Sequence, residues 1–351
     1  MVNILYFMSI KVNKDIIILA IESSCDDTSV AISKNKEILV NIVANQKVHK
    51  EYGGVVPELA SREHQKNIVP TISLAIKMSK ISKDQIDAIA FTRGPGLMGS
   101  LLVGASFAKS LSISLKKPLI EINHMEAHVL ANCIDDDPVF PFICLTVSGG
   151  HTQIVRVENV NQIEVIGETI DDSAGETFDK CAKMLGLNYP GGPEIEKNSK
   201  HGNHLAFSFT HPKVDGLNFS FSGLKTNFMR LIQNKSINNP SFIQHRLSDL
   251  CASIQYTIIQ ILTNKLDLAI RKYNVKNIAI SGGVAANQEF RKAIISLEKK
   301  YNTKALIPKK EYSTDNAAMI AISSYYKYRT SQFTKTSINV DPRYKLKQYD
   351  Q

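Results

Sequence analysis

Two stretches of the chain repeat the same strand–turn–strand plan, one near the start and one near the middle. Residues 16–33 hold an apolar run, a short polar turn and a second apolar run, and residues 142–156 follow the same order. Apolar runs around turns rich in Ser, Gly and Asp are typical of β-hairpins. Two similar hairpins, each opening about half of a chain of 351 residues, predict a duplicated domain with a cleft between its copies; chance similarity of short hairpins is the alternative.

Helical patterns lie between and after these hairpins, so strands and helices alternate along the chain. We expect helices at 58–78, with a break at Pro70, and at 99–114, 174–186 and 241–273. Alternation of this kind predicts a layered α/β fold. We expect four segments: an extension at 1–14, a first domain at 15–135 whose last helix packs against the second, a second domain at 136–330, and a basic tail at 331–351.

Composition and charge exclude several classes of protein. Hydrophobic residues make up 43% and charged residues 21% of the chain, which excludes disordered, collagen-like and coiled-coil chains. The longest apolar run, residues 16–21, is far shorter than the ~18 residues that span a bilayer, and the start lacks the basic stretch of a secretion signal. Five scattered cysteines without a C-x-x-C pair favour reduced thiols, so we expect a cytoplasmic protein with no membrane segment. The formal net charge of +9 is a weak indication of a polyanionic partner.

Two histidines one helical turn apart are the first candidates for chemistry. His124 and His128 follow a strand-like segment, and positions i and i+4 of a helix share one face, so both imidazoles can reach one metal ion. Glu126 lies between them and points off that face, unlike the general base of an H-E-x-x-H zinc peptidase, which argues against a metallopeptidase. A coincidental pair is the alternative, and a metal site requires a third ligand from elsewhere.

The best candidate for that third ligand is Asp315. It follows Ser313 and Thr314 at the expected start of a helix, so a simple N-cap is the alternative interpretation. Two imidazoles and one carboxylate with open positions suit non-haem Fe(II), and Zn(II) can use the same ligands. We therefore predict one divalent metal per subunit, iron before zinc, held by His124, His128 and Asp315.

Two glycine turns and an acidic segment are candidates for substrate binding. The turns at 146–150 and 281–287 could bring backbone N–H groups against a phosphate, and we expect them on opposite walls of one cleft, with the amide of Asn287 near a sugar or base. Ordinary tight-turn geometry is the alternative. The acids of residues 171–196 could accept hydrogen bonds from ribose hydroxyls or an ammonium group, although a solvated acidic helix face has the same pattern.

Ten motifs occur in the order expected for one known family. They run from ILAIESSCDDTSVAI and GGVVPELASREH through RGPGLMGSLLVG, NHMEAH, VSGGHTQIV, DDSAGETFDK, YPGGP, FSFSGLKT and SGGVAAN to STDNAAM, and they cover about residues 16–320. The chain thereby resembles the bacterial TsaD family, the tRNA N6-adenosine threonylcarbamoyltransferases. The resemblance implies an actin/Hsp70/sugar-kinase-like fold, in which two RNase H-like domains face each other across a cleft.

The resemblance also implies the reaction, the site and the partners. The reaction moves a threonylcarbamoyl group from threonylcarbamoyl-AMP to the exocyclic amine of adenosine 37 in tRNAs that read codons beginning with A, and it releases AMP. The metal ligands are the three named above, and the metal is usually iron. The partners are a TsaB-like paralogue, a TsaE-like ATPase and a TsaC-like enzyme that makes the donor. The adenylate pocket is implied to comprise Thr146, Val147, Ser148, Gly149, Gly150, Asp179, Gly192, Glu196 and Asn287.

Two positions depart from the family pattern. Thr146 stands where bacterial relatives often carry Leu and archaeal ones a metal-facing Tyr, and Glu196 replaces a commoner Asp. No protein base can be named, and the segment RYKLK at 343–347 is either a contact for the tRNA backbone or a solvated tail. Alternatives of the same fold are a sugar kinase, a small-molecule carbamoyltransferase and a non-catalytic actin-like nucleotide-binding subunit. The three metal ligands argue against the subunit, and a kinase does not require them.

Overall fold

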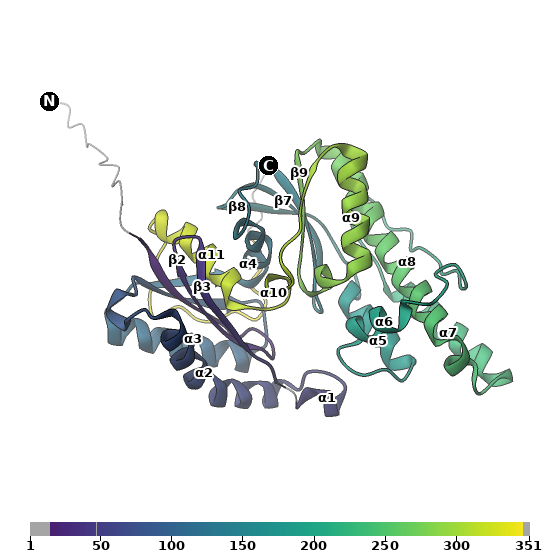
Figure 1. Cartoon of the computed structure of the whole chain (residues 1–351), viewed down its shortest axis with the longest axis horizontal. Helices are drawn as coiled ribbons and strands as arrows, with labels where there is room; N and C mark the ends of the chain where they lie inside the picture. Colours follow the sequence, from purple (N-terminus) through teal and green to yellow (C-terminus); the bar gives the residue numbers. More distant parts are fainter. Residues whose placement is uncertain (1–14, 47, 347–351) are drawn as a thin grey trace.

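The computed structural model describes residues 15–46 and 48–346 (Figure 1). The extension expected at 1–14 and the last residues of the basic tail, 347–351, lie outside the described residues. The described chain forms two lobes, each built around a five-stranded sheet. In Figure 1 the yellow helix α11 lies in the same lobe as the purple N-terminal strands, so the chain returns to its first lobe after forming the second.

The first sheet has the strand order β3-β2-β1-β4-β5. β1 and β2 form an antiparallel hairpin in which Ala20 lies opposite Ala31, and β4 and β5 continue the sheet in parallel. This confirms the first predicted hairpin. β1 reads as a continuous apolar run because helices cover both faces of the sheet. The strand bounds are Ile17–Glu22 (β1), Thr28–Lys34 (β2), Glu37–Ala44 (β3), Ala88–Gly94 (β4) and Leu119–Asn123 (β5).

The second sheet repeats this plan with the order β10-β9-β6-β7-β8. β6 and β7 form its antiparallel hairpin, and β9 and β10 run parallel to β6 on the other side. The second predicted hairpin and the predicted duplication are therefore confirmed. The strand bounds are Phe142–Val147 (β6), Thr152–Asn159 (β7), Gln162–Glu168 (β8), Asn277–Ser281 (β9) and Lys304–Leu306 (β10).

One face of the first sheet is covered by α2 (Pro57–Ser79) and α3 (Met98–Leu115); the short α1 (His49–Tyr52) precedes them. The predicted break at Pro70 is wrong, because α2 continues through it. Pro70 is exposed, so the carbonyl one turn earlier that it leaves unpaired can bind water. On the opposite side of the helix Ile68 and Ile72 are buried against the sheet, and this packing holds the helix together.

Helix α3 qualifies by length and composition as a helix that could cross a membrane, with a mean hydropathy of 1.3 over 18 residues. The expectation of no membrane segment rested on unbroken apolar runs and overlooked α3, because serines and Lys109 interrupt its apolar residues. In the fold α3 packs against α2 and β4, and its Leu101, Ala105 and Ala108 are buried. It therefore forms part of a helical layer of the α/β lobe.

Five helices cover one face of the second sheet and share its largest apolar core, which includes Phe178, Leu250 and Phe290 (Figure 1). The predicted helices at 99–114, 174–186 and 241–273 are confirmed to within two residues at each end. The helices of this face are α5 (Ala174–Met184), α6 (Gly191–Ser199), α7 (Ser222–Asn238), α8 (Phe242–Tyr273) and α9 (Gln288–Tyr301).

Two segments cross between the lobes. The first is α4 (His124–Leu130) followed by the short helix η2 (Ala131–Cys133). Leu130, at the end of α4, packs with Phe142 of the second sheet. The second is α11 (Ala317–Arg329), which lies in the second domain by the expected boundaries but packs on the first sheet. Its small side chains at 317 and 318 let it lie close to the strands. The two crossing helices touch each other at the junction of the lobes.

The segment after α11 returns along the first lobe. Thr334 pairs with Leu119 at the edge of the sheet, and the N–H of Asp341 donates to the carbonyl of Arg93 (2.9 Å). Gly94 lies at this contact with a φ of +153°, and a Cβ there would be 1.8 Å from the carbonyl oxygen of Asp341. The close approach of the tail therefore requires glycine at this position.

We expect Gly94→Ala to lower the free energy of unfolding by about 2 kcal/mol, because the substitution adds backbone strain and pushes the tail away from β4. Urea unfolding measures this change. Gly223→Ala on α7 is the control, since its Cβ would meet open space and the substitution should not destabilise the protein. Equal stability of the two variants would contradict this account of Gly94.

Candidate active site

The two predicted histidines lie on the first crossing helix. Asn123 ends β5 and caps α4, because its side-chain oxygen accepts hydrogen bonds from the N–H groups of Met125 (2.9 Å) and Glu126 (3.2 Å). The cap sets the start of the helix, so His124 is its first residue and His128 lies one turn later on the same face. Both side chains are buried, and their ring centroids are 4.6 Å apart.

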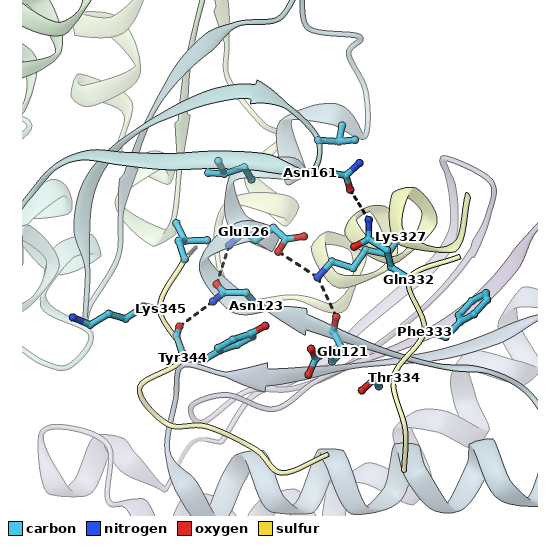
Figure 2. A pocket seen from close by; sticks show the side chains of 13 residues that line it. Glu121, Asn123, Glu126, Asn161, Lys327, Gln332, Phe333, Thr334, Tyr344 and Lys345 are labelled. Carbon is cyan, nitrogen blue, oxygen red and sulfur yellow. Dashed lines mark hydrogen bonds and ion pairs between the residues drawn. The ribbon is translucent and has the colours of Figure 1, made fainter. Parts of the chain in front are cut away.

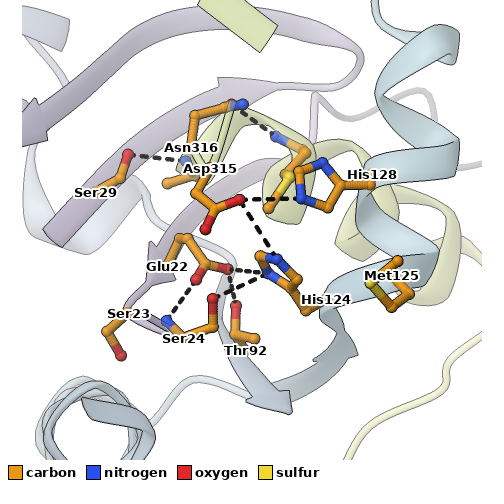
Figure 3. Close-up of polar contacts among 12 residues, drawn as sticks. Glu22, Ser23, Ser24, Ser29, Thr92, His124, Met125, His128, Asp315 and Asn316 are labelled. Atoms are coloured by element: carbon orange, nitrogen blue, oxygen red, sulfur yellow. Dashed lines mark hydrogen bonds and ion pairs between the residues drawn. The ribbon is translucent and has the colours of Figure 1, made fainter. Parts of the chain in front are cut away.

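Asp315 reaches these rings from the second crossing segment, between α10 (Lys310–Ser313) and α11. Its Oδ1 lies 3.0 Å from Nε2 of His128 and 3.5 Å from Nε2 of His124 (Figure 3). The N-cap of α11 is the next residue, Asn316, whose side chain accepts a hydrogen bond from the N–H of Met319 (3.2 Å). The interpretation of Asp315 as a simple N-cap is therefore wrong.

The three side chains have the donor types and the spacing of a metal site. One ligand atom from each lies within 4.8 Å of the others. Bonds of about 2.1 Å to one cation, about 90–109° apart, would separate the donor atoms by roughly 3.0–3.4 Å, close to the two distances above. His124 and Asp315 also line a cavity, so coordination positions that the protein does not fill would face open space. The group is compatible with a divalent cation.

A buried carboxylate contacts the second ring nitrogen of His124, Nδ1 (Figure 3). Glu22, the last residue of β1, is 1% exposed, and its Oε2 lies 3.2 Å from Nδ1 of His124. The hydroxyl of Thr92 donates to the same oxygen (2.5 Å), and the N–H of Ser24 donates to Oε1 (2.6 Å). A carboxylate that accepts the Nδ1 proton leaves Nε2 of the imidazole to bind a metal. No role was predicted for Glu22 from the sequence, although a charged residue at the end of an otherwise apolar strand could have indicated a functional site.

The charges of this cluster favour a cation. Burial alone would lower the pKa of His124, but the carboxylates of Glu22 and Asp315 outweigh it and raise the pKa to about 10. Burial alone would raise the pKa of Asp315, but the imidazoles of His124 and His128 hold it well below its usual range. Without a metal, His124 therefore carries a proton near pH 7, and a divalent cation would displace that proton on binding.

A cavity of about 700 Å³ opens in front of His124 and Asp315. One wall is the turn after β1, Ser24–Asp27, and the opposite wall is the corresponding turn after β6, Ser148–His151. The expectation that the two glycine turns lie on opposite walls is wrong. The turns after β6 and β9 lie side by side, because these strands are parallel neighbours in one sheet. A cavity of this size and position is typical of a small-molecule site.

The predicted substrate-binding residues divide into those that line the cavity and those behind it. Thr146 and Val147 are fully buried in β6, and Thr146 Oγ1 lies 2.9 Å from the hydroxyl of Ser281. Of the acids in the segment 171–196, Asp172 pairs with lysines outside the cavity. The residues that do line it are Ser148, Gly149, Gly150, Glu176, Asp179 and, from the turn at 281–287, Gly283.

The other three predicted residues belong to the packing around α6 and α9. Gly192 lies beside the N–H of Gly191 that donates to Asp179 (2.7 Å). Glu196 Oε1 accepts a hydrogen bond from the N–H of Gln288 (2.8 Å), which ties α6 to α9. Asn287 caps α9 by accepting from Phe290 N–H (3.0 Å), and its amide group donates to Gln255 (2.7 Å). Both ends of the Asn287 amide already make a hydrogen bond, and Asn287 does not line the cavity, so its expected contact with a sugar or base stays a prediction.

Cys25 also lines the cavity, although the sequence patterns did not predict it as a site residue. Burial and the carboxylates of Asp26 and Asp315 raise the pKa of its thiol far above its ordinary value. The sulfur therefore stays protonated near pH 7, and a thiol is a poor nucleophile. All five cysteines of the chain are free.

Two further unanticipated residues of the cavity can accept a proton. Burial raises the pKa of Asp27 to about 7, although the amide of Asn45 donates a hydrogen bond to it (2.7 Å). Burial and the imidazoles of His124 and His128 lower the pKa of His151 to about 4, so it is neutral near pH 7. An acid that titrates near neutral pH inside a cleft is a common property of functional sites.

Comparison with solved structures defines the class of fold. The chain is similar to HypF of T. kodakarensis, with a TM-score of 0.60 at 14% identity over 92% of this chain and 50% of HypF. It is also similar to component A of (R)-2-hydroxyglutaryl-CoA dehydratase from Acidaminococcus fermentans, with a TM-score of 0.51 at 17% identity over 89% and 98% of the two chains. The two lobes with repeated sheets and a cleft between them thus form an actin/Hsp70/sugar-kinase-like fold, as expected.

Sequence comparison then defines the family. The family model described as "TsaD: tRNA N6-adenosine threonylcarbamoyltransferase" matches residues 37–322. Proteins of that name from Christiangramia forsetii and Porphyromonas gingivalis are 58% and 56% identical to the chain, over 94% and 91% of its length and 98% and 96% of theirs. The chain belongs to the TsaD family of tRNA N6-adenosine threonylcarbamoyltransferases, which confirms the resemblance. It is a transferase that acts in tRNA threonylcarbamoylation.

Proposed function

We propose that the chain transfers the threonylcarbamoyl group of threonylcarbamoyl-AMP to the exocyclic amine of adenosine 37 in tRNAs that read codons beginning with A, with release of AMP. The family supports tRNA adenosine as the acceptor. The observation that carries the proposal is the meeting of Asp315 with both imidazoles at the edge of a cavity between the lobes.

A reconstituted reaction tests this function. The purified chain is incubated with tRNA, threonine, bicarbonate and ATP, with and without the proposed partner proteins, and the digested tRNA is examined by mass spectrometry. We expect threonylcarbamoyladenosine only when the chain is present. Product that forms equally well without the chain would contradict the proposal.

His124, His128 and Asp315 would hold one divalent cation, which we propose to be Fe(II), with Zn(II) as the alternative. Such a cation supplies Lewis acidity toward the carbonyl oxygen of the donor. The donor set and the spacing of its atoms support this assignment. The carboxylates of Glu22 and Asp315 on either side of the His124 ring also support it, because their negative charge favours a cation at this position.

The chain's own residues would position the two substrates. A Cβ at Gly149 or Gly150 would meet open space, so the backbone of this turn is accessible to the phosphate of the donor. The N6 lone pair of adenosine forms a bond to the carbamoyl carbon, the bond from that carbon to the phosphate oxygen breaks, and AMP leaves with its electron pair. Since the donor is an activated anhydride, no covalent protein nucleophile is required, in agreement with the protonated thiol of Cys25.

We propose Asp27 as the acceptor of the proton that the adenosine amine releases. A base is most effective when its pKa is near the working pH, and the pKa of Asp27 is about 7 whereas that of His151 is about 4. A cation bound nearby would favour the ionised form of Asp27, which is the form that accepts a proton, and would thereby bring its pKa below about 7.

Glu22→Gln is expected to weaken metal binding by about 10–100-fold, because the substitution removes the charge that orients His124 and replaces one acceptor oxygen with a donor. Metal titration followed by thermal denaturation measures the affinity. The matched control is Glu126→Gln, since Glu126 lies between the two histidines in sequence but pairs with Lys327 (3.3 Å). Equal metal affinity of the two variants would show that Glu22 does not orient the ligand.

We further propose a TsaB-like paralogue and a TsaE-like ATPase as partners, a TsaC-like enzyme as the source of the donor, and the cytoplasm as the compartment. The five free cysteines support a reducing compartment.

A further inference from the structure

A second cavity, of about 450 Å³, adjoins the cavity that contains His124 and Asp315. The two cavities share Pro95 and Gly96 from the first lobe and His151 from the second. The shared residues form a boundary between the two spaces. A group in the second cavity would therefore lie against residues that also line the cavity of His124 and Asp315.

The C-terminal segment 342–346 forms the rim of the second cavity. The N–H of Gly96 donates to the carbonyl of Pro342 (3.2 Å), and the amide of Asn123 donates to the carbonyl of Tyr344 (2.9 Å; Figure 2). The guanidinium of Arg93 lies 4.3 Å from the centroid of the Tyr344 ring. These contacts hold the backbone of the segment against the residues that border the first cavity.

The rim carries more positive than negative charge. Arg343 and Lys345 line the second cavity and are exposed. Among the described residues that line it, Glu168 is the one acid, and it accepts a hydrogen bond from Gln153 (3.2 Å). A third pocket, drawn in Figure 2, shares Tyr344 and Lys345 with the second cavity. Its acids already have cationic partners, since Glu121 pairs with Arg93 (3.0 Å) and Glu126 with Lys327. Two cations held on an ordered backbone are suited to bind phosphate groups.

The acceptor of the reaction is one base within a large RNA. The sugar–phosphate backbone of that RNA cannot fit inside a cavity of about 700 Å³ together with the donor, so it must remain at an opening while the base reaches inward. An opening for the base therefore needs a space beside the donor cavity and cations at its edge. The second cavity has both.

We propose that the second cavity receives the target adenosine of the tRNA and that Arg343 and Lys345 bind phosphates of the flanking nucleotides. This inference rests on the proposed function. The base lies between the C-terminal segment and the boundary formed by Pro95, Gly96 and His151, and its exocyclic amine points across that boundary to the donor.

The double variant R343Q/K345Q tests the inference in the full chain with its partners and with threonylcarbamoyl-AMP supplied. We expect KM for tRNA to rise about tenfold and kcat at saturating tRNA to change less than twofold. The slope of log kcat/KM against log salt concentration should become shallower by about 1.4, which is roughly 0.7 for each single-strand phosphate contact that is lost.

The matched control is R230Q/K299Q, which removes the same charge from exposed positions on α7 and α9 that line neither cavity. It should keep the KM and salt slope of the unmodified chain. Filter binding of an anticodon stem-loop RNA over the same salt series gives a second reading that does not depend on transfer. Unchanged KM, RNA affinity and salt slope in R343Q/K345Q would overturn the inference, whereas absence of product with normal RNA binding would count against the proposed function.

Discussion

Asp315→Ala is expected to remove the bound metal and to lower transfer to tRNA by at least about 1,000-fold, which corresponds to the several kcal/mol that a Lewis-acid cation supplies. Asp315 contacts both imidazoles, so its loss leaves two ligands on one helix and opens the site. Metal analysis of the purified variant and mass spectrometry of the modified tRNA measure the two effects.

Glu311→Ala is the matched control for this prediction. Glu311 is an exposed carboxylate on the short helix immediately before Asp315, so its removal perturbs the same segment without touching the cluster. We expect the control to keep full metal content and full activity. A folded Asp315→Ala variant that still binds one metal and modifies tRNA would exclude the proposed site.

Asp27→Asn is expected to lower the rate of transfer by about 100-fold or more, because an amide cannot accept the proton from the adenosine amine. The pH dependence gives the sharper test. With Asp27 present, the rate should rise with pH up to about 7, since the carboxyl group must lose its proton before it can act as a base, and a bound cation would move this limb to lower pH. The variant should lack the limb.

The neighbouring acid Asp26 lines the same cavity and provides the control. Asp26→Asn keeps Asp27 and should keep the rise of the rate with pH. If the rise persists in Asp27→Asn, the proton goes to a group other than Asp27, and the proposed role of Asp27 is wrong.

The parts of the fold that local patterns determine could be predicted from the sequence. The two hairpins and the helices at α3, α5 and α8 follow from runs of apolar residues and the turns between them. Pro70 shows the limit of such reasoning, because burial of Ile68 and Ile72 against the sheet holds α2 together across a residue that breaks isolated helices. The packing of α11 on the first sheet depends on contacts far apart in sequence, which no local pattern contains.

The candidate site likewise has a part that local patterns predict and a part that depends on contacts between distant residues. The i, i+4 spacing of His124 and His128 predicted a shared face, but their meeting with Asp315, 187 residues away from His128, follows from the two crossing segments. Asn287 differs from the histidines, because its local pattern predicted contact with a ligand. In the fold its side chain caps α9 and pairs with the buried amide of Gln255. Glu22 was missed because its role depends on burial next to an imidazole from another strand–helix unit.

X-ray absorption spectroscopy of the metal-loaded protein tests the central claim most directly. For a cation held by His124, His128 and Asp315, we predict a first shell of nitrogen and oxygen atoms at about 2.0–2.2 Å that includes two imidazoles. In His128→Ala the imidazole contribution should fall to one. A metal shell without imidazole scattering, or one that His128→Ala leaves unchanged, would contradict the account.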